Sequence, residues 1–178
     1  SQAVRLVSGV FYAAEGNQES YTVEAKELIR KDIGRPDAEV MFLVGGTQTN
    51  ATAIDGILAR HEGVLAADSG HIAVHESGAI EASGHKVLTL ASHEGKVRAE
   101  DVDNYITEFY KDETYQHMVA PGMLYISQPT EYGTIYSLET LTLTMPYMRF
   151  FNSRYRFESF PSSMRKPIAV DVKLLERE

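Results

Sequence analysis

Two glycines and a threonine stand where an apolar stretch of the chain gives way to a helical pattern. The segment FLVGGTQTNATAIDG, residues 42–56, passes through Gly45, Gly46 and Thr47 into an amphipathic sequence. A glycine pair lets the backbone turn tightly and expose successive N–H groups, and the following helix adds the positive end of its dipole. This pattern fits phosphate binding, and it also fits an ordinary tight turn. It matches neither GxGxxG nor the lysine-containing P-loop.

A second segment is rich in histidine and glutamate. The stretch ADSGHIAVHESGAIEASGH, residues 67–85, contains His71, His75 and Glu76. The i, i+4 spacing of the histidines would place both rings on one helical face, where Glu76 could complete a metal set, but the glycines of the segment weaken such a helix. An imidazole can instead stack on a flat ligand or exchange protons near neutral pH. A loop with satisfied surface histidines is the simplest interpretation, so we predict no metal site.

A third group of polar residues follows the strand-like segment 123–127. The stretch YISQPTEYGTIYSL, residues 125–138, places Thr130 and Glu131 between Pro129 and Gly133. These residues could line a binding cleft, or they could simply form a polar turn that the proline and glycine favour.

The elements that must position these residues alternate between helical and strand patterns. Apolar residues recur at helical spacing over residues 23–33, 51–60 and 102–109, and short apolar runs predict strands at 40–44, 64–67, 86–90 and 123–127. This order predicts an α/β fold, a three-layer α-β-α domain around a mainly parallel sheet. Ligands bind at the carboxyl ends of such strands. The three polar segments should therefore converge at one edge.

Composition narrows the classes of function. A length of 178 residues predicts one domain. A formal charge of -8 argues against nucleic acid or an anionic membrane as partner, and no apolar run approaches the roughly 20 residues that span a bilayer. The absence of cysteine excludes disulfides and thiolate chemistry, and it fits a cytoplasmic location. The opening VRLVSGVFYAAE, residues 4–15, is interrupted by Ser8 and Gly9, so we interpret it as the interior of a longer gene product.

The three segments, taken in order, resemble a known family. VGGTQTNATAI, ADSGHIAVHESGAIEASGHKVL and YISQPTEYGTIYSL are similar to the amino-terminal half of threonine-aldolase-like enzymes of the β-eliminating lyase family, over about residues 21–141. The resemblance implies an incomplete fold-type-I large domain and a pyridoxal 5'-phosphate cofactor. It also implies an amino-acid substrate, cleavage of β-hydroxy amino acids to glycine and an aldehyde, and a homo-oligomer.

The resemblance also implies roles for individual residues. Gly45, Gly46 and Thr47 would bind the cofactor phosphate, and His71 would lie against the face of the pyridine ring near the substrate hydroxyl. The substrate side of the cleft would be lined by Thr130 and Glu131. Many aldolases carry a histidine at the position of Glu131.

The carboxyl-terminal part departs from the family. The family requires an Asp that binds the pyridine nitrogen, an Arg shortly after it, and a Lys that forms the Schiff base. The segment PIAVD, residues 167–171, is similar to the strand that supplies this Asp, but Val172 and Lys173 follow where the family has Gly-Ala-Arg. No lysine stands in a setting that matches the Schiff-base motif. We therefore expect that this chain alone is inactive.

We interpret residues 1–141 as a partial cofactor-binding domain and residues 142–178 as an atypical basic, aromatic tail. Acidic residues outnumber basic ones up to residue 139, and the balance reverses from residue 140. Three interpretations of this tail are open. It could come from a frameshifted, misspliced or truncated product, or it could pack its apolar side chains on the edge of the sheet. It could also bind single-stranded nucleic acid by stacking and charge.

Two hypotheses about function follow. In the first, the chain is a truncated or divergent pyridoxal-phosphate lyase of the threonine-aldolase type. In the second, it is a non-catalytic fragment that retains the phosphate pocket or acts as an assembly partner. A hydrophobic edge left by an incomplete sheet would favour oligomerisation or aggregation.

Overall fold

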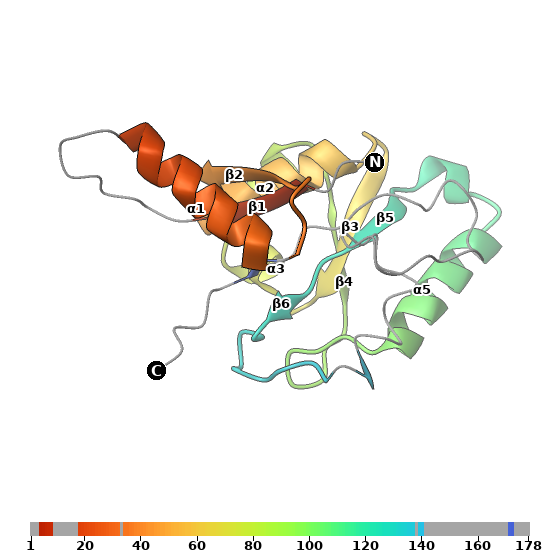
Figure 1. The fold of residues 1–178 in the computed structure, drawn as a ribbon. Helices are drawn as coiled ribbons and strands as arrows, with labels where there is room; N and C mark the ends of the chain where they lie inside the picture. Colours follow the sequence, from red (N-terminus) through yellow and green to blue (C-terminus); the bar gives the residue numbers. More distant parts are fainter. Residues whose placement is uncertain (1–3, 9–17, 33, 138, 141–170, 173–178) are drawn as a thin grey trace.

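The computed structural model of this chain describes residues 4–8, 18–32, 34–137, 139–140 and 171–172 (Figure 1). Its helices are α1 (Gln18–Asp32), α2 (Gly46–Ile57), α3 (His71–Val74), α4 (Ala79–Ala82) and α5 (Ala99–Lys111), with one 3₁₀ turn, η1 (Tyr115–His117). Its strands are β1 (Val4–Ser8), β2 (Glu39–Leu43), β3 (Glu62–Ala67), β4 (Val87–Leu90), β5 (Ala120–Leu124), β6 (Ser127–Gln128) and β7 (Asp171–Val172). Among these described residues, no helix has the length and apolar content needed to cross a membrane.

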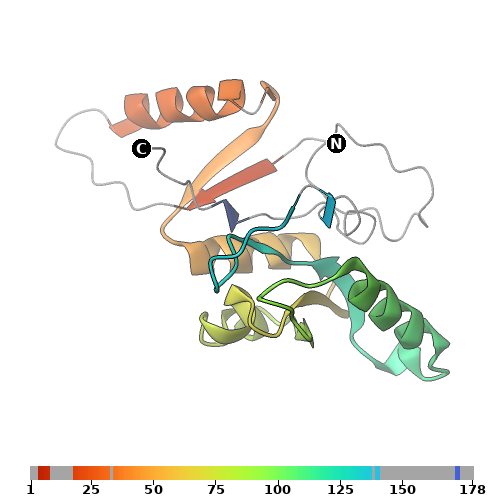
Figure 2. The ribbon, with the colours of Figure 1, turned by 90° about the horizontal axis from the view of Figure 1, so that it is seen from below.

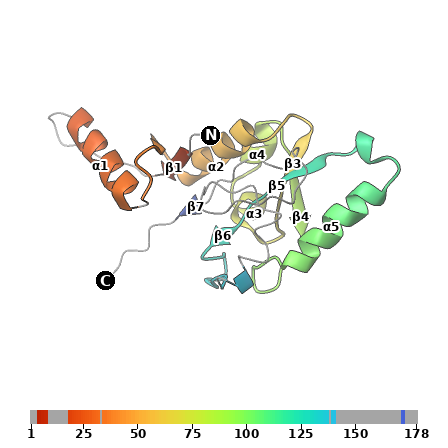
Figure 3. The same cartoon turned by 45° about the vertical axis from the view of Figure 1, so that its right-hand side comes forward.

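The strands pair in parallel, as the alternating pattern predicts. β3 lies between β4 and β5, β1 pairs with β2, and β6 pairs with β7. The strands β3 to β5 lie between α2 and α5 (Figures 1 and 3). A parallel sheet with flanking helices is therefore confirmed, and the carboxyl ends of β3, β4 and β5 meet at one edge of the sheet.

The core forms where the two helices meet the central strands. Helix α2 contributes Ile54 and Leu58 follows its end, whereas α5 contributes Val102, which is fully buried. The central strand β3 is buried from Gly63 to its end, as expected for a strand covered on both faces. The acidic first turn of α5 lies at the positive end of the helix dipole, which favours that end as the helix start.

The structure corrects several element boundaries. The opening segment contains strand β1, which pairs with β2, and the sequence pattern had assigned no element there. The single strand predicted at 123–127 is two strands, β5 and β6, because the chain leaves the pairing with β3 after Leu124. The predicted histidine loop contains the short helices α3 and α4. Ile33 at the end of the first predicted helix, and the tail apart from residues 171–172, lie outside the described residues.

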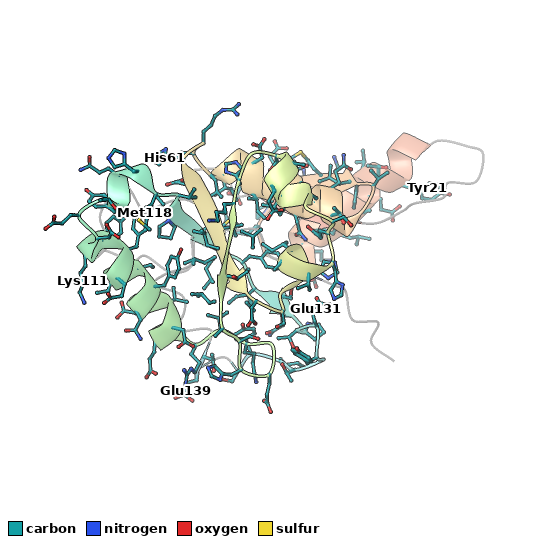
Figure 4. The ribbon with its side chains drawn as sticks, turned by 180° about the vertical axis from the view of Figure 1, so that it is seen from behind. Tyr21, His61, Lys111, Met118, Glu131 and Glu139 are labelled. Atoms are coloured by element: carbon teal, nitrogen blue, oxygen red, sulfur yellow. The ribbon has the colours of Figure 1, made fainter. Side chains whose placement is uncertain are left out.

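Helix α1 lies apart from the core. It is on the opposite side of the molecule from α5 (Figures 1 and 2), and Tyr21 is far from the central strands (Figure 4). Apolar side chains on this helix are exposed, including Tyr21, Val23 and Leu28. Such a helix presents apolar surface that the described part of the chain does not cover.

Candidate functional site

The start of α2 leaves open space beside two glycines. Gly45 precedes the helix in extended backbone, and Gly46 is the first helical residue. Among the described residues, a Cβ added at either glycine would meet no atom within 4 Å beyond its chain neighbours and the backbone of its own helix. The first backbone hydrogen bond of the helix runs from the N–H of Thr49 to the carbonyl of Gly45, at 3.0 Å. The N–H groups of the preceding helical residues therefore point out of the helix end, where an anion would meet them and the positive dipole.

Thr47 lies in the first turn of this helix with an exposed side chain. Its hydroxyl is on the same helix end as the exposed N–H groups. A small anionic group at this end could accept hydrogen bonds from both the backbone and a hydroxyl. The structure thus brings Gly45, Gly46 and Thr47 together as one polar helix end.

His71 begins the short helix α3 directly after the Gly70 turn that follows β3. Its Nδ1 lies 3.0 Å from Oε1 of Glu131, and the other carboxylate oxygen of Glu131 lies 3.6 Å from Nε2 of His75. The His71 side chain is 29% exposed and the Glu131 side chain is 21% exposed. Figure 4 shows Glu131 beside α3, although the two segments are distant in the sequence. This half-buried pair of an acid and an imidazole has the composition of a proton-transfer site.

Behind His71 lies a buried carboxylate. The side chain of Glu76 is 0% exposed, and its Oε1 accepts a hydrogen bond of 2.8 Å from Nδ2 of Asn50 on α2. The same Oε1 lies 4.0 Å from Nε2 of His71. Within the part of the chain that the structure describes, the other oxygen of Glu76 has no hydrogen-bond partner. A buried oxygen of this kind is costly, and it is typical of sites that meet a further group.

Asn50 also connects these residues to the third polar segment. Its Nδ2 lies 3.4 Å from the hydroxyl of Tyr125, and Oγ of Ser127 lies 3.4 Å from that same hydroxyl. Residues from α2, from the segment after α3 and from the β5–β6 connection therefore meet in one buried polar network. This convergence at the carboxyl ends of the strands agrees with the expectation from the sequence.

Thr130 occupies a different environment from Glu131. It is buried, and its hydroxyl lies 2.7 Å from the hydroxyl of Thr134 and accepts a bond of 3.2 Å from the N–H of that residue. The side chain closes the turn that carries Glu131. The Thr130 hydroxyl is thus engaged within the turn rather than directed at His71.

Tyr136 anchors the far end of the same turn. Its hydroxyl accepts a buried hydrogen bond of 2.7 Å from the N–H of Val97. Burial raises the pKa of Tyr136, and the hydrogen bond from Val97 opposes that rise in part. The amide side chain of Gln128 accepts a bond of 2.9 Å from the N–H of Tyr136, so the loop around Glu131 is held at both ends.

The histidine and acidic residues of the described ranges form no group of three or more that could hold a metal ion. His85, the last histidine of the second segment, is buried away from His71: its Nδ1 lies 2.9 Å from the carbonyl of Glu62. Its environment is structural.

Comparison with known proteins assigns the family. The profile of the family described as beta-eliminating lyase matches residues 15–146. The chain belongs to the β-eliminating lyase family. The family match covers all three polar segments and α1 to β6, and it stops before β7.

Individual members of the family show similarity over the same part. The chain is 29% identical over 125 residues to a low specificity L-threonine aldolase of Pseudomonas sp., and 25% identical over 125 residues to one of Pseudomonas aeruginosa. Each alignment covers 69% of this chain and 35% of the relative. The solved structure of a Leishmania major threonine aldolase matches with a TM-score of 0.64 and 44% identity, over 70% of this chain and 35% of that chain. The chain thus spans about a third of the length of the relatives it matches.

Two features of the candidate site were not predicted from the sequence. Asn50 was not singled out, although an amide on the apolar side of a helix, four residues before Ile54, is a signal of a buried polar contact. Asp171 was set aside because of the residues that follow it, yet its backbone pairs with Ser127 in the β6–β7 pair. The backbone of this strand therefore reaches the third polar segment, and Lys173 lies outside the described residues.

Proposed function

We propose that this chain is the phosphate- and ring-binding part of a pyridoxal-phosphate lyase of the threonine-aldolase type, which cleaves β-hydroxy amino acids to glycine and an aldehyde. The observation that carries the proposal is the meeting of the three sequence segments through two contacts, His71 with Glu131 and Asn50 with Glu76. The similarity to threonine aldolases supports the same chemistry.

The residues present fit this cofactor. The open space beside Gly45 and Gly46, with the N–H groups of α2 and the Thr47 hydroxyl, suits a phosphate. The half-buried ring of His71 offers an aromatic face for the pyridine ring. The oxygen of buried Glu76 that lacks a partner among the described residues supports a site that meets a further group. Pyridoxal phosphate, when bound, supplies an electron sink for cleavage next to the amino-acid α-carbon.

The chain's own residues would then bind and move protons around the substrate. Glu131 and His71 form the acid–imidazole pair at the half-buried mouth of the site, where one of them can take the proton of the β-hydroxyl and return it to the α-carbon side. Thr130 would serve the substrate side by closing the turn that carries Glu131. The half-buried position of the pair would limit water access to the reacting atoms.

No lysine of the chain stands in the family's Schiff-base setting, and we propose that the chain alone binds the cofactor without completing the reaction.

A cofactor-trapping experiment tests the proposal. The purified chain is mixed with pyridoxal phosphate, the visible absorption is recorded, and borohydride is added before the modified lysine is mapped. We expect His71→Ala and Gly46→Val to weaken cofactor binding, because the first removes the ring face and the second fills the space beside α2. Matched controls are His61→Ala, at an exposed histidine, and Gly56→Val, where the added side chain also meets open space on α2.

The outcomes separate the two hypotheses. One labelled lysine, with a band that weakens in the two site variants and not in the controls, supports a working lyase site. Saturable binding without a trapped lysine supports a chain that binds the cofactor but is inactive alone. Label scattered over surface lysines, with no effect of the site variants, would contradict the cofactor site and favour a non-catalytic fragment.

We further propose that the chain forms a homo-oligomer in the cytoplasm. The support is the apolar surface that α1 and the end of β2 leave exposed: Tyr21 is 68% exposed and Val44 is 72% exposed. Sedimentation showing a compact monomer at micromolar concentration would contradict this assembly. The cysteine-free composition supports the reducing compartment.

A further inference from the structure

The buried carboxylate of Glu76 is unusual for a residue that only stabilises the fold. Its side chain is fully buried, it receives one hydrogen bond from Asn50, and its Oε2 has no partner among the described residues. A buried charge with incomplete hydrogen bonding is destabilising relative to a neutral residue of the same shape. Glutamine at this position could keep the bond with Asn50 without the charge.

The position of Glu76 explains what the charge can do. His71 lies between two carboxylates: Glu131 is 3.0 Å from Nδ1, on the solvent side, and Oε1 of Glu76 is 4.0 Å from Nε2, on the buried side. His75 is the other titratable group against this ring, with ring centroids 5.5 Å apart. Carboxylates accept hydrogen bonds and cannot donate them, so Glu131 favours a proton on Nδ1 of His71, and the charge of Glu76, 4.0 Å away, favours a second proton on Nε2.

The partner of Glu76 adds a second link. Asn50 is on α2, one turn after Thr47, and it holds Oε1 at 2.8 Å. The helix end that would bind the phosphate and the imidazole that would cover the pyridine ring are therefore connected through a single pair of side chains. A change at this pair alters the position of one half of the site relative to the other.

We propose that Glu76 is a positioning residue, which uses its charge to fix the buried edge of the His71 ring while Asn50 ties it to α2. The role of the ring toward the cofactor rests on the function proposed above. The positioning of the ring itself is a property of the chain without cofactor, so it can be tested separately.

A side-chain exchange distinguishes positioning from plain structural support. Glu76→Gln removes the charge, Asn50→Asp places two carboxylates against each other, and the double variant Asn50→Asp with Glu76→Gln restores one amide, one carboxylate and the bond between them. In the double variant the carboxylate is carried by α2 and no longer by residue 76. Glu81→Gln is the control, because it removes an exposed carboxylate from neighbouring α4.

Three quantities are measured on the full chain. The melting temperature reports stability, the ¹⁵N shifts of the His71 ring nitrogens without cofactor report the ring's proton position, and tyrosine fluorescence quenching reports the Kd for pyridoxal phosphate. Inorganic phosphate is titrated as the second probe, because it meets only the helix end. The His71 resonances are assigned with His71→Gln.

We expect Glu76→Gln to keep or raise the melting temperature, because it removes a buried charge. The Nε2 resonance of His71 should move toward the position of an unprotonated ring nitrogen, and the Kd for pyridoxal phosphate should rise by about tenfold, as expected for one lost interaction with a charged group. The Kd for inorganic phosphate should not change. Asn50→Asp should lower the melting temperature, and the double variant should restore it without restoring the His71 resonance.

The proposal is overturned if the His71 resonance is the same in Glu76→Gln as in the unmodified chain, or if the double variant restores that resonance together with the melting temperature. Either result would make the pair a structural bond only. If the unmodified chain fails to bind pyridoxal phosphate, the proposed function fails, and the resonances still decide whether Glu76 positions the ring. If Asn50→Asp does not fold, Glu76→Gln and the double variant give the answer.

Discussion

Replacing Tyr136 with phenylalanine should destabilise the chain by removing a single oxygen atom. The Tyr136 hydroxyl accepts a hydrogen bond of 2.7 Å from the N–H of Val97, and these two residues are 3% and 1% exposed. Phenylalanine keeps the ring in place but leaves the buried N–H without its acceptor, which costs about 1–3 kcal/mol. For a chain of this size each kcal/mol lowers the melting temperature by about 2–4 °C, so we expect a decrease between about 2 and 12 °C.

The assay is thermal unfolding followed by circular dichroism, with Tyr132→Phe as the matched control. Tyr132 is 67% exposed, so losing its hydroxyl should change the free energy of unfolding by less than about 0.5 kcal/mol. If Tyr136→Phe is as stable as Tyr132→Phe, the buried hydrogen bond does not stabilise the loop. The reasoning about how the Glu131 turn is held would then be wrong.

The same residue gives a dependence on pH. Burial raises the pKa of Tyr136 above the value of 10.0 of an unperturbed tyrosine, so the folded state holds this proton more tightly than the unfolded state. The resulting stabilisation is fully present below pH 10.0 and is lost as the pH rises through the folded-state pKa. As the pH rises above 10.0, the free energy of unfolding of Tyr136→Phe should therefore decrease less than that of the unmodified chain.

Three further predictions concern other parts of the fold. Gly95→Ala should destabilise more than Gly133→Ala in denaturant titrations. Both glycines have positive φ, but a Cβ on Gly95 would lie 2.8 Å from a ring carbon of Tyr132, whereas one on Gly133 would meet none of the described residues within 4 Å. The φ strain alone should cost about 1–2 kcal/mol, so equal losses would show that the contact is relieved without cost. Leu124→Ala should cost about 2–5 kcal/mol, since Leu124 is fully buried in β5, and a smaller loss would mean that the core collapses around the missing atoms. The Arg35 side chain lowers the pKa of Asp37 to about 2, mainly by hydrogen bonding. The stabilisation from this bond is therefore fully present above pH 3.8 and is lost as the pH falls through about 2. In an NMR titration of Arg35→Gln, the pKa of Asp37 should rise toward 3.8, and an unchanged pKa would refute the pairing.

Much of the fold follows from hydrophobic periodicity. The strands β3 and β4 and the helices α2 and α5 were predicted because their apolar residues repeat with the period of each structure. Strand β1 was missed because its sequence, VRLVS, is short and its partner β2 lies across α1 in the sequence. Pairing over that separation is a tertiary property, and a local pattern carries no information about it.

The sequence predicted where the residues of the candidate site lie, but it predicted only some of the contacts between them. The rule that ligands bind at the carboxyl ends of parallel strands placed His71 and Glu131 at one edge, where the structure joins them. The contacts of Glu76 were not predicted: its spacing from the histidines raised a metal ligand only as an alternative that we did not favour, and the structure buries it against Asn50. Burial of a glutamate depends on which residues surround it in three dimensions, so spacing alone could not reveal it.

The position of β3 between β4 and β5 has a consequence for the order in which the chain can fold. Glu62 of β3 pairs with Ala120 of β5, so this pairing waits until β4 and α5 have been synthesised. Until then the apolar residues of β3 lack their neighbouring strand β5. Parallel pairing of strands this far apart in the sequence is slow, because a long loop must close first. A chain interrupted before residue 120 would expose an apolar parallel edge to other chains. We therefore expect β3 to be the segment that chaperones protect during synthesis of this protein.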